Sequence, residues 1–326
     1  MAAAKAGNTI YVAGGQEKMH QAKPTRTFLS LDLSKKGEQI SFEWEELQPW
    51  PGPARILPVA AAQSDGTTDC FYLFSGRMPV AGKTTALLTD GYKYDPVQGQ
   101  WKVTTNVSGN LKGGSDGNCV MAASCIPSGS SHILVFGGDD GRIFNELDSL
   151  QYQITMLSDD DNGRLKNQIE QIKKKRIDIL ENHPGFSRDI LAYHTITDTW
   201  TKIGELPSES QVTTTAVMWN DSIIIPSGEI RPGVRTSQIW KATPKTTAKF
   251  GAVNYTVLAV YLCALLIMGL YFSRREKSTD DFFKGGKRIP WWAAGMSIFG
   301  TQLSAITFMA IPAKTFATNW LYLWGN

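Results

Sequence analysis

Hydrophobic and polar positions follow two different patterns along the chain. Up to about residue 245, short apolar runs such as residues 9–12 are separated by turn residues, which is typical of β-strands. Residues 252–272 are 21 consecutive positions without a charge, enough for a helix to cross the hydrocarbon core of a bilayer. The pattern therefore predicts a β-domain over residues 1–245 and a membrane part over residues 250–326.

Four apolar runs in the first part end in Gly-Gly or Ser-Gly, and we call each of them a strand–glycine motif. The glycines that end the four motifs are Gly15, Gly76, Gly138 and Gly228, at intervals of 61, 62 and 90 residues. The third interval also becomes 61 residues when the 29 residues from 157 to 185 are set aside. The first part is therefore a regular repeat with one insertion.

An aromatic turn follows each of the first three motifs. The turns contain Trp44, Asp95-Pro96 with Trp101, and the stretch from His194 to Trp200. A tryptophan at this place would fill the wedge between neighbouring twisted sheets. A period near 60 residues with four short strands per unit is typical of β-propeller blades; the alternative is a β-sandwich with irregular turns.

The insertion is predicted to be helical over residues 158–185. Leu165, Ile169 and Ile172 have the spacing of an apolar helix stripe, and Asn162 is a suitable cap for its start. We expect this helix to pack on the outside of the propeller, with binding to a partner as the alternative.

The charge of the chain argues against nucleic-acid binding, and its cysteines allow two interpretations. The net charge of +3 is too small to indicate nucleic acid as a partner, and the basic run at residues 173–176 lies within the helical pattern, where it serves as a solvated face. Pairing of Cys119 with Cys125 is one interpretation of the four cysteines. The other is that they are small buried residues.

Several stretches of the first part occur in the order of a known family. They are PGPAR before FSGR, DGYKYDPVQGQW, LVFGGDDGRIFN and IIIPSGEIRPGVRTSQIW. Residues 42–240 thereby resemble the cyclically permuted mutarotases, which include N-acetylneuraminate epimerase. The resemblance implies an all-β kelch-type β-propeller of six blades. Four are visible here, so we expect sequence to be missing at both ends.

The resemblance also implies an active-site pair, Glu229 and Arg235. Glu229 would act as the base that takes a proton from the anomeric hydroxyl. Arg235 would hold the sugar carboxylate with two hydrogen bonds, and Arg231 would assist in binding the substrate. No cofactor is implied for the propeller. The alternative for Glu229 is a turn carboxylate that faces water.

The second part contains a further apolar segment, residues 291–313, that is rich in small and polar residues, as in the core of a transporter. The loop between the segments, residues 273–290, carries six basic and three acidic residues. By the positive-inside rule this loop is cytoplasmic and the propeller lies on the outer, periplasmic side.

The loop STDDFFKGGKRIPWW and the helix AAGMSIFGTQLSAITFMAIPA are similar to the opening of sodium:solute symporters. The similarity implies two transmembrane helices of a truncated symporter, the second of them broken. Backbone carbonyls of Gly300 and Leu303 would bind Na⁺, and the side chains of Gln302, Ser304 and Thr307 would face the substrate. Packing between helices is the alternative role for these polar residues.

These observations predict a sugar mutarotase fused to a sodium-driven carrier. The propeller would interconvert anomers of a sialic-acid-like sugar, and the carrier would import one of them across the lipid bilayer. A propeller that binds sugar without converting it, or that serves as a protein-interaction scaffold tethered to a transporter, is the alternative.

Overall fold

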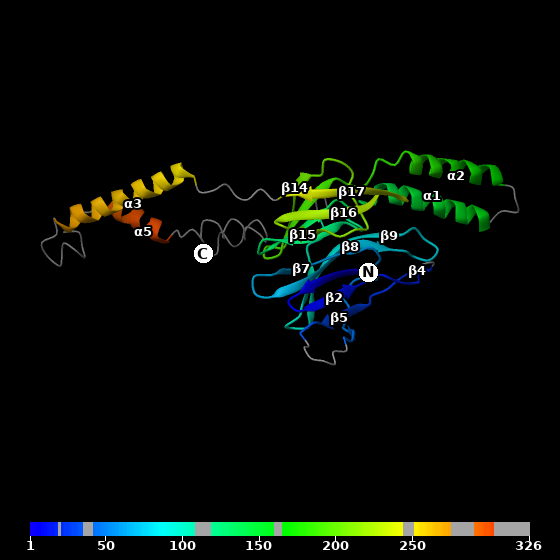
Figure 1. Ribbon diagram of the computed structural model, residues 1–326, viewed down its shortest axis with the longest axis horizontal. Coiled ribbons are helices and arrows are strands. Elements are labelled where there is room, and N and C mark those ends of the chain that lie inside the picture. Colours follow the sequence, from blue (N-terminus) through cyan, green and yellow to red (C-terminus); the bar gives the residue numbers. More distant parts are fainter. Residues whose placement is uncertain are drawn as a thin grey trace. The chain divides into compact units, whose positions relative to one another are not determined.

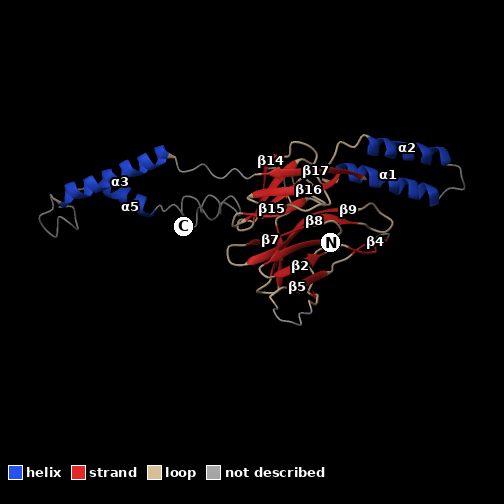
Figure 2. Cartoon of the chain, in the orientation of Figure 1, coloured by secondary structure: helices blue, strands red, loops and turns tan. Residues whose placement is uncertain are grey.

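The structure, a computed structural model, describes residues 1–18, 21–34, 42–107, 119–159, 165–243, 251–274 and 290–302. The chain divides into two compact units, Met1–Pro244 and Lys245–Asn326. Among the described residues, the first unit contains the strands and two helices, whereas the second is helical (Figure 2).

Four antiparallel sheets follow one another along the first unit (Figure 1). Within each sheet, hydrogen-bonded neighbours follow chain order, which is the meander of a propeller blade. Blade 1 contains β1 (Ala2–Ala6), β2 (Thr9–Ala13), β5 (Phe28–Asp32) and β6 (Glu45–Glu46), and blade 2 contains β7 (Val59–Ser64), β8 (Asp69–Met78), β9 (Ala86–Asp95) and β10 (Gln100–Thr104). Blade 3 contains β11 (Ser124–Ser128), β12 (His132–Phe136), β13 (Asp189–His194) and β14 (Thr199–Glu205). Blade 4 contains β15 (Val217–Trp219), β16 (Ser222–Arg231) and β17 (Val234–Ala242). A separate hairpin of β3 (Gln16–Lys18) and β4 (Gln21–Pro24) lies between the second and third strands of blade 1. The predicted propeller is confirmed.

The hydrophobic core lies between the blades. Alternate residues of a strand point to opposite faces, so Phe71 and Leu73 of β8 pack towards blade 1 while Tyr72 and Phe74 pack towards blade 3. This explains the unbroken apolar run in β8, because both of its faces are buried. All four cysteines are free. Cys70 and Cys119 are buried, which supports the interpretation as buried residues for these two, whereas Cys125 is half-buried and Cys263 is exposed.

Two of the three predicted tryptophans fill the spaces between blades. Trp101 packs edge-on against Phe28 at 4.8 Å between ring centroids, and Trp200 packs against Phe74 at 4.9 Å. The prediction for Trp44 is wrong: its side chain is 50% exposed. Trp44 precedes the two-residue outer strand β6, and the fully buried Trp50 takes the inner place beside Trp101.

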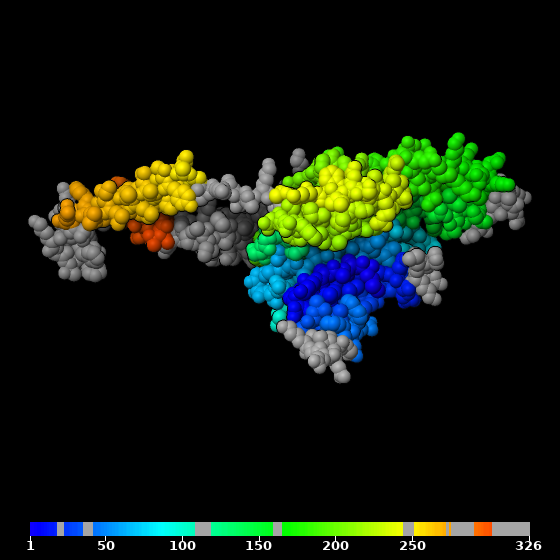
Figure 3. Space-filling model, in the orientation of Figure 1, coloured from blue at the N-terminus to red at the C-terminus, as the bar shows by residue number. Residues whose placement is uncertain are grey.

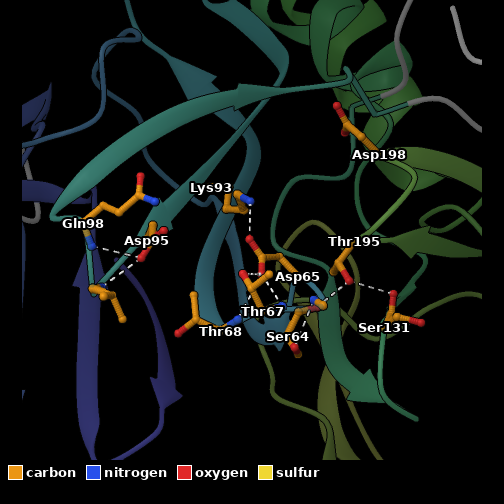
Figure 4. Close-up of polar contacts among 12 residues, drawn as sticks. Ser64, Asp65, Thr67, Thr68, Lys93, Asp95, Gln98, Ser131, Thr195 and Asp198 are labelled. Carbon is orange, nitrogen blue, oxygen red and sulfur yellow. Dashed lines mark hydrogen bonds and ion pairs between the residues drawn. The ribbon is translucent and has the colours of Figure 1, made fainter.

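Polar contacts tie blade 2 to blade 3 at the turns (Figure 4). The Thr195 hydroxyl donates to the carbonyl of Ser64 at 2.6 Å and to that of Ser131 at 3.0 Å. The Gln63 amide donates to the carbonyl of His132 at 2.8 Å. These bonds satisfy carbonyls at the ends of strands and link the two sheets.

The insertion is larger than predicted, because it contains two helices packed side by side, α1 (Arg142–Asp159) and α2 (Lys166–Glu181) (Figure 1). The predicted helix corresponds to α2, whereas α1 was not foreseen, although its buried Leu147 and Leu150 have helical spacing. The proposed cap, Asn162, lies outside the described residues. The insertion, green in Figure 3, extends beyond the sheets.

The second unit begins with helix α3 (Ala252–Ser273). Its residues Ala252–Tyr271 are long and apolar enough to cross a membrane, with a mean hydropathy of 2.0. Helix α5 (Trp291–Gln302) is also apolar. Most of the predicted cytoplasmic loop, and the remainder of the second apolar segment, lie outside the described residues.

Candidate functional site

The hairpin of β16 and β17 brings Glu229 and Arg235 together. The two residues lie directly opposite each other in the antiparallel register. Opposed residues of such a pair project from the same face, with Cβ atoms about 5 Å apart. The Pro232-Gly233 turn closes the hairpin between Arg231 and Val234. The spacing of the motif therefore places a carboxylate beside a guanidinium.

The carboxylate of Glu229 is oriented by the backbone of its own hairpin. Its Oε1 accepts a hydrogen bond from the N–H of Gly233 at 2.6 Å. The backbone of Glu229 is bonded in both directions to Val212, at 2.9 and 3.0 Å. Arg235 is exposed, and the ion pairs among the described residues do not include it. A fixed carboxylate therefore lies beside a cation that is available to an anionic ligand.

The helical insertion supports this hairpin. The guanidinium of Arg231 donates to the carbonyl of Glu181, the last residue of α2, at 3.4 Å. The N–H of Phe186 donates to the carbonyl of Ile230 at 3.3 Å. Arg231, predicted to assist in substrate binding, is therefore also a link between the insertion and blade 4.

A hollow of about 610 Å³ lies where the inner strands of the blades converge. It is lined by β1, β7 and β11 and by residues 213–216, so all four blades contribute to it. Val212, the backbone partner of Glu229, immediately precedes this last lining segment. The backbone of Glu229 is therefore tied to the residue before a wall segment of this central hollow, although Glu229 itself does not line it.

A second cavity, of about 800 Å³, lies between blade 3 and the two ends of the insertion. Asp139 and His183 are among its lining residues. Burial raises the pKa of Asp139, although the N–H of Gly141 and the cation of Arg77 act in the opposite direction. Burial also lowers the pKa of His183, whose Nδ1 accepts a hydrogen bond from Gly185. This imidazole is thus favoured in its neutral form, with the proton on Nε2.

Sequence reasoning missed Asp139 and His183 as candidate site residues. A signal for Asp139 was present in the sequence. A polar residue directly follows the last glycine of every strand–glycine motif, and in the fourth motif this residue is Glu229. His183 has no such signal, because it lies within the predicted helical insertion, residues 158–185, and outside the repeated motifs.

The residues predicted for the membrane site are only partly within the described chain. Gly300 lies inside the regular helix α5, and Gln302 is its last residue. Leu303, Ser304 and Thr307 lie outside the described residues, so sodium and substrate binding by this set stay predictions. In the described part, no three His, Cys, Asp or Glu side chains gather as metal ligands.

The fold and the hairpin together define a kelch-type β-propeller with a carboxylate–arginine pair at the end of its fourth blade. Residues 1–256 match the family described as N-acetylneuraminate epimerase, and the chain belongs to this family. A relative named N-acetylneuraminate epimerase, from Haemophilus influenzae, is 27% identical over 250 residues, which are 74% of this chain and 56% of that protein. The solved structure titled "Structure of YjhT" has a TM-score of 0.57 and 19% identity, over 76% of this chain and 61% of that one.

A separate similarity is to transporters. The sodium/sialic acid symporter SiaT of Proteus mirabilis is 55% identical over 77 residues, 24% of this chain and 16% of that protein. The sodium/sialic acid symporter NanT of Aliivibrio fischeri is 57% identical over 77 residues, 24% of this chain and 15% of that protein. The chain thus spans about half the length of its epimerase relatives and about a sixth of its symporter relatives.

Proposed function

We propose that the propeller interconverts the anomers of N-acetylneuraminate or a closely similar sugar acid, and that the second unit belongs to a sodium-driven symporter for the same compound. Membership of the epimerase family and the similarity to sodium/sialic acid symporters support the two halves of this proposal. A fusion of the two would deliver the product beside the entrance of the carrier at a high effective concentration.

The observation that carries the enzymatic half is the pairing of Glu229 with Arg235 across β16 and β17. Mutarotation opens and recloses a hemiketal, so it needs a base for the anomeric hydroxyl and an anchor that orients the sugar. Glu229 supplies the base, because its carboxylate is held in place by the N–H of Gly233. Arg235 binds the carboxylate of the sugar acid through two parallel hydrogen bonds.

The test is anomer exchange of N-acetylneuraminate, followed by ¹H NMR with the complete chain in detergent, with the spontaneous rate as the baseline. Glu229→Gln keeps the size of the side chain but removes its basicity, so we expect kcat to fall roughly 10²- to 10⁴-fold. Arg235→Gln removes the anchor and is expected mainly to raise KM.

Glu170→Gln is the matched control, because Glu170 is an exposed carboxylate that pairs with Lys173 on helix α2. Binding of N-acetylneuraminate by calorimetry completes the test. Binding without exchange in the unmodified chain would instead make the propeller a sugar-binding module, and unchanged exchange in Glu229→Gln would refute the assignment of the base.

A further inference from the structure

The residue that follows the last glycine of the strand–glycine motif has the same backbone position in three of the blades. In blade 4, Glu229 exchanges two hydrogen bonds with Val212, in the loop that enters β15. In blade 3, Asp139 exchanges two hydrogen bonds with Met121, at 2.9 and 3.1 Å, in the loop that enters β11. Arg77 pairs with Ile56 in the same way in blade 2. Asp139 is therefore the equivalent, in blade 3, of Glu229.

The two carboxylic residues are also neighbours around the propeller axis. The N–H of Thr213, next to Val212, donates to the carbonyl of Ala122, next to Met121, at 3.1 Å. The loop that holds Glu229 is thus bonded directly to the loop that holds Asp139. Asp139 and Glu229 therefore occupy corresponding backbone positions in neighbouring blades.

The surroundings of the two carboxyl groups differ. Glu229 lies opposite the exposed cation Arg235 and is bonded to a turn N–H. Asp139 lies in the wall of the 800 Å³ cavity, where burial raises its pKa. Its Oδ1 accepts the N–H of Gly141 at 2.8 Å, and no hydrogen bond to Oδ2 is found among the described residues. Two carboxyl groups in different surroundings, one beside an exposed cation and one in a cavity wall, are the usual arrangement of an acid and a base.

We propose that Asp139 is the general acid of the anomer exchange, in partnership with Glu229 as the base. This inference rests on the proposed function. It fills a gap in the chemistry, because Glu229 and Arg235 alone leave no group to protonate the ring oxygen. The adjoining cavity has a volume in the range of small-molecule sites, and its wall residue Phe186 is bonded to the strand of Glu229.

Ring opening transfers two protons in opposite directions. Glu229 takes the proton of the anomeric hydroxyl while the bond between the anomeric carbon and the ring oxygen breaks. The electron pair of that bond goes to the ring oxygen, which takes a proton from Asp139. The open-chain keto acid, a neutral Glu229 and an ionised Asp139 result. In reclosure on the other face, the attacking hydroxyl returns a proton to Asp139 and the carbonyl oxygen takes one from Glu229, so no proton is gained or lost.

The test is Asp139→Asn in the complete chain, with anomer exchange of N-acetylneuraminate as the readout. The amide keeps the hydrogen bond from Gly141 but has no proton to transfer, so we expect kcat to fall at least roughly 10²-fold with KM changed little. The matched control is Asp69→Asn, because Asp69 is an exposed carboxylate at the start of β8 in blade 2 and does not line this cavity; this variant should keep its activity.

The pH profile separates chemistry from structure. In the unmodified chain, exchange should decline as the pH rises through the pKa of Asp139, and Asp139→Asn should lack this decline. Arg77, Cys119, Asp140 and His183 are the charged or titratable groups near Asp139 among the described residues. The variant His183→Gln should retain the decline, which would show that the imidazole is not its source.

The outcomes distinguish this inference from the proposal on which it rests. Loss of exchange in Glu229→Gln together with full activity in Asp139→Asn overturns the acid assignment alone. Absence of exchange in the unmodified chain overturns the proposed function itself. If Asp139→Asn does not fold, Asp139→Glu replaces it, and an unshifted pH profile in that variant contradicts the inference.

Discussion

Gly228, the residue before the proposed base, has a backbone conformation that side chains oppose. Its φ of +134° lies in a region that L-residues rarely adopt, and a Cβ there would lie 2.8 Å from the Cβ of Gln211. Gln211 adjoins Val212, which holds the backbone of Glu229. The glycine is therefore required both for the bend of β16 and for the close approach that positions Glu229.

Gly228→Ala should destabilise the propeller by about 2 kcal/mol or more, from backbone strain and overpacking, and should lower anomer exchange by displacing Glu229. Gly82→Ala is the control, because Gly82 has a φ of +67° but open space around its Cβ; we expect a cost of about 1 kcal/mol there and unchanged exchange. Chemical unfolding of the complete chain, measured beside the NMR assay, checks both values. Equal effects of the two substitutions would show that the contact with Gln211 has no role.

At the scale of elements, contacts between neighbouring blades decide which turns lie together. Thr195 joins blade 3 to blade 2 through the carbonyl of Ser64, 131 positions away in the sequence. The hydrogen bond from Arg231 to the carbonyl at the end of α2 likewise joins segments that are distant in the sequence. Such bonds link adjacent sheets, and the packing of these sheets shapes the central hollow.

Thr195→Val keeps the shape of the side chain but removes the hydroxyl that donates to the part-buried carbonyl of Ser64. The expected loss of unfolding free energy is roughly 1–3 kcal/mol. Thr201→Val, at an exposed position of β14, should change stability by less than about 0.5 kcal/mol. Should thermal or urea unfolding rank the two variants equally, the contact between blades would not contribute to stability.

At the scale of the whole molecule, the chain combines a unit that buries its apolar residues with a helix, Ala252–Tyr271, whose apolar residues are exposed. Exposed apolar surface of this extent is stable in lipid rather than in water. The charge of the loop at residues 273–290 then favours a cytoplasmic place for that loop, with the propeller on the other side.

This orientation predicts which cysteines a membrane-impermeant maleimide reaches. In cells with a permeable outer membrane, Thr201→Cys in the propeller should be labelled, and Ser278→Cys in the loop should be labelled only after the inner membrane is opened. The unmodified chain, in which Cys70 and Cys119 are buried, gives the background. The reverse labelling pattern would place the propeller in the cytoplasm.

Much of the architecture follows from the sequence alone. The strand–glycine repeat, helix α2 and the apolar span depend on period, turn residues and spacing within a few positions of one another, whereas the pair of Glu229 and Arg235 was implied by the family resemblance. The first three are local properties of the chain, so the pattern of residues is sufficient to predict them.

Only the tertiary structure decided which distant segments meet. It placed Trp50 rather than Trp44 beside Trp101, and it connected Arg231 to the end of α2. It also bonded the loop that pairs with Asp139 to the loop that pairs with Glu229. These contacts join residues of different blades or of the insertion, and they depend on how twisted sheets pack around a common axis. Period and composition do not encode that packing, which is why the proposed acid becomes visible only in the folded chain.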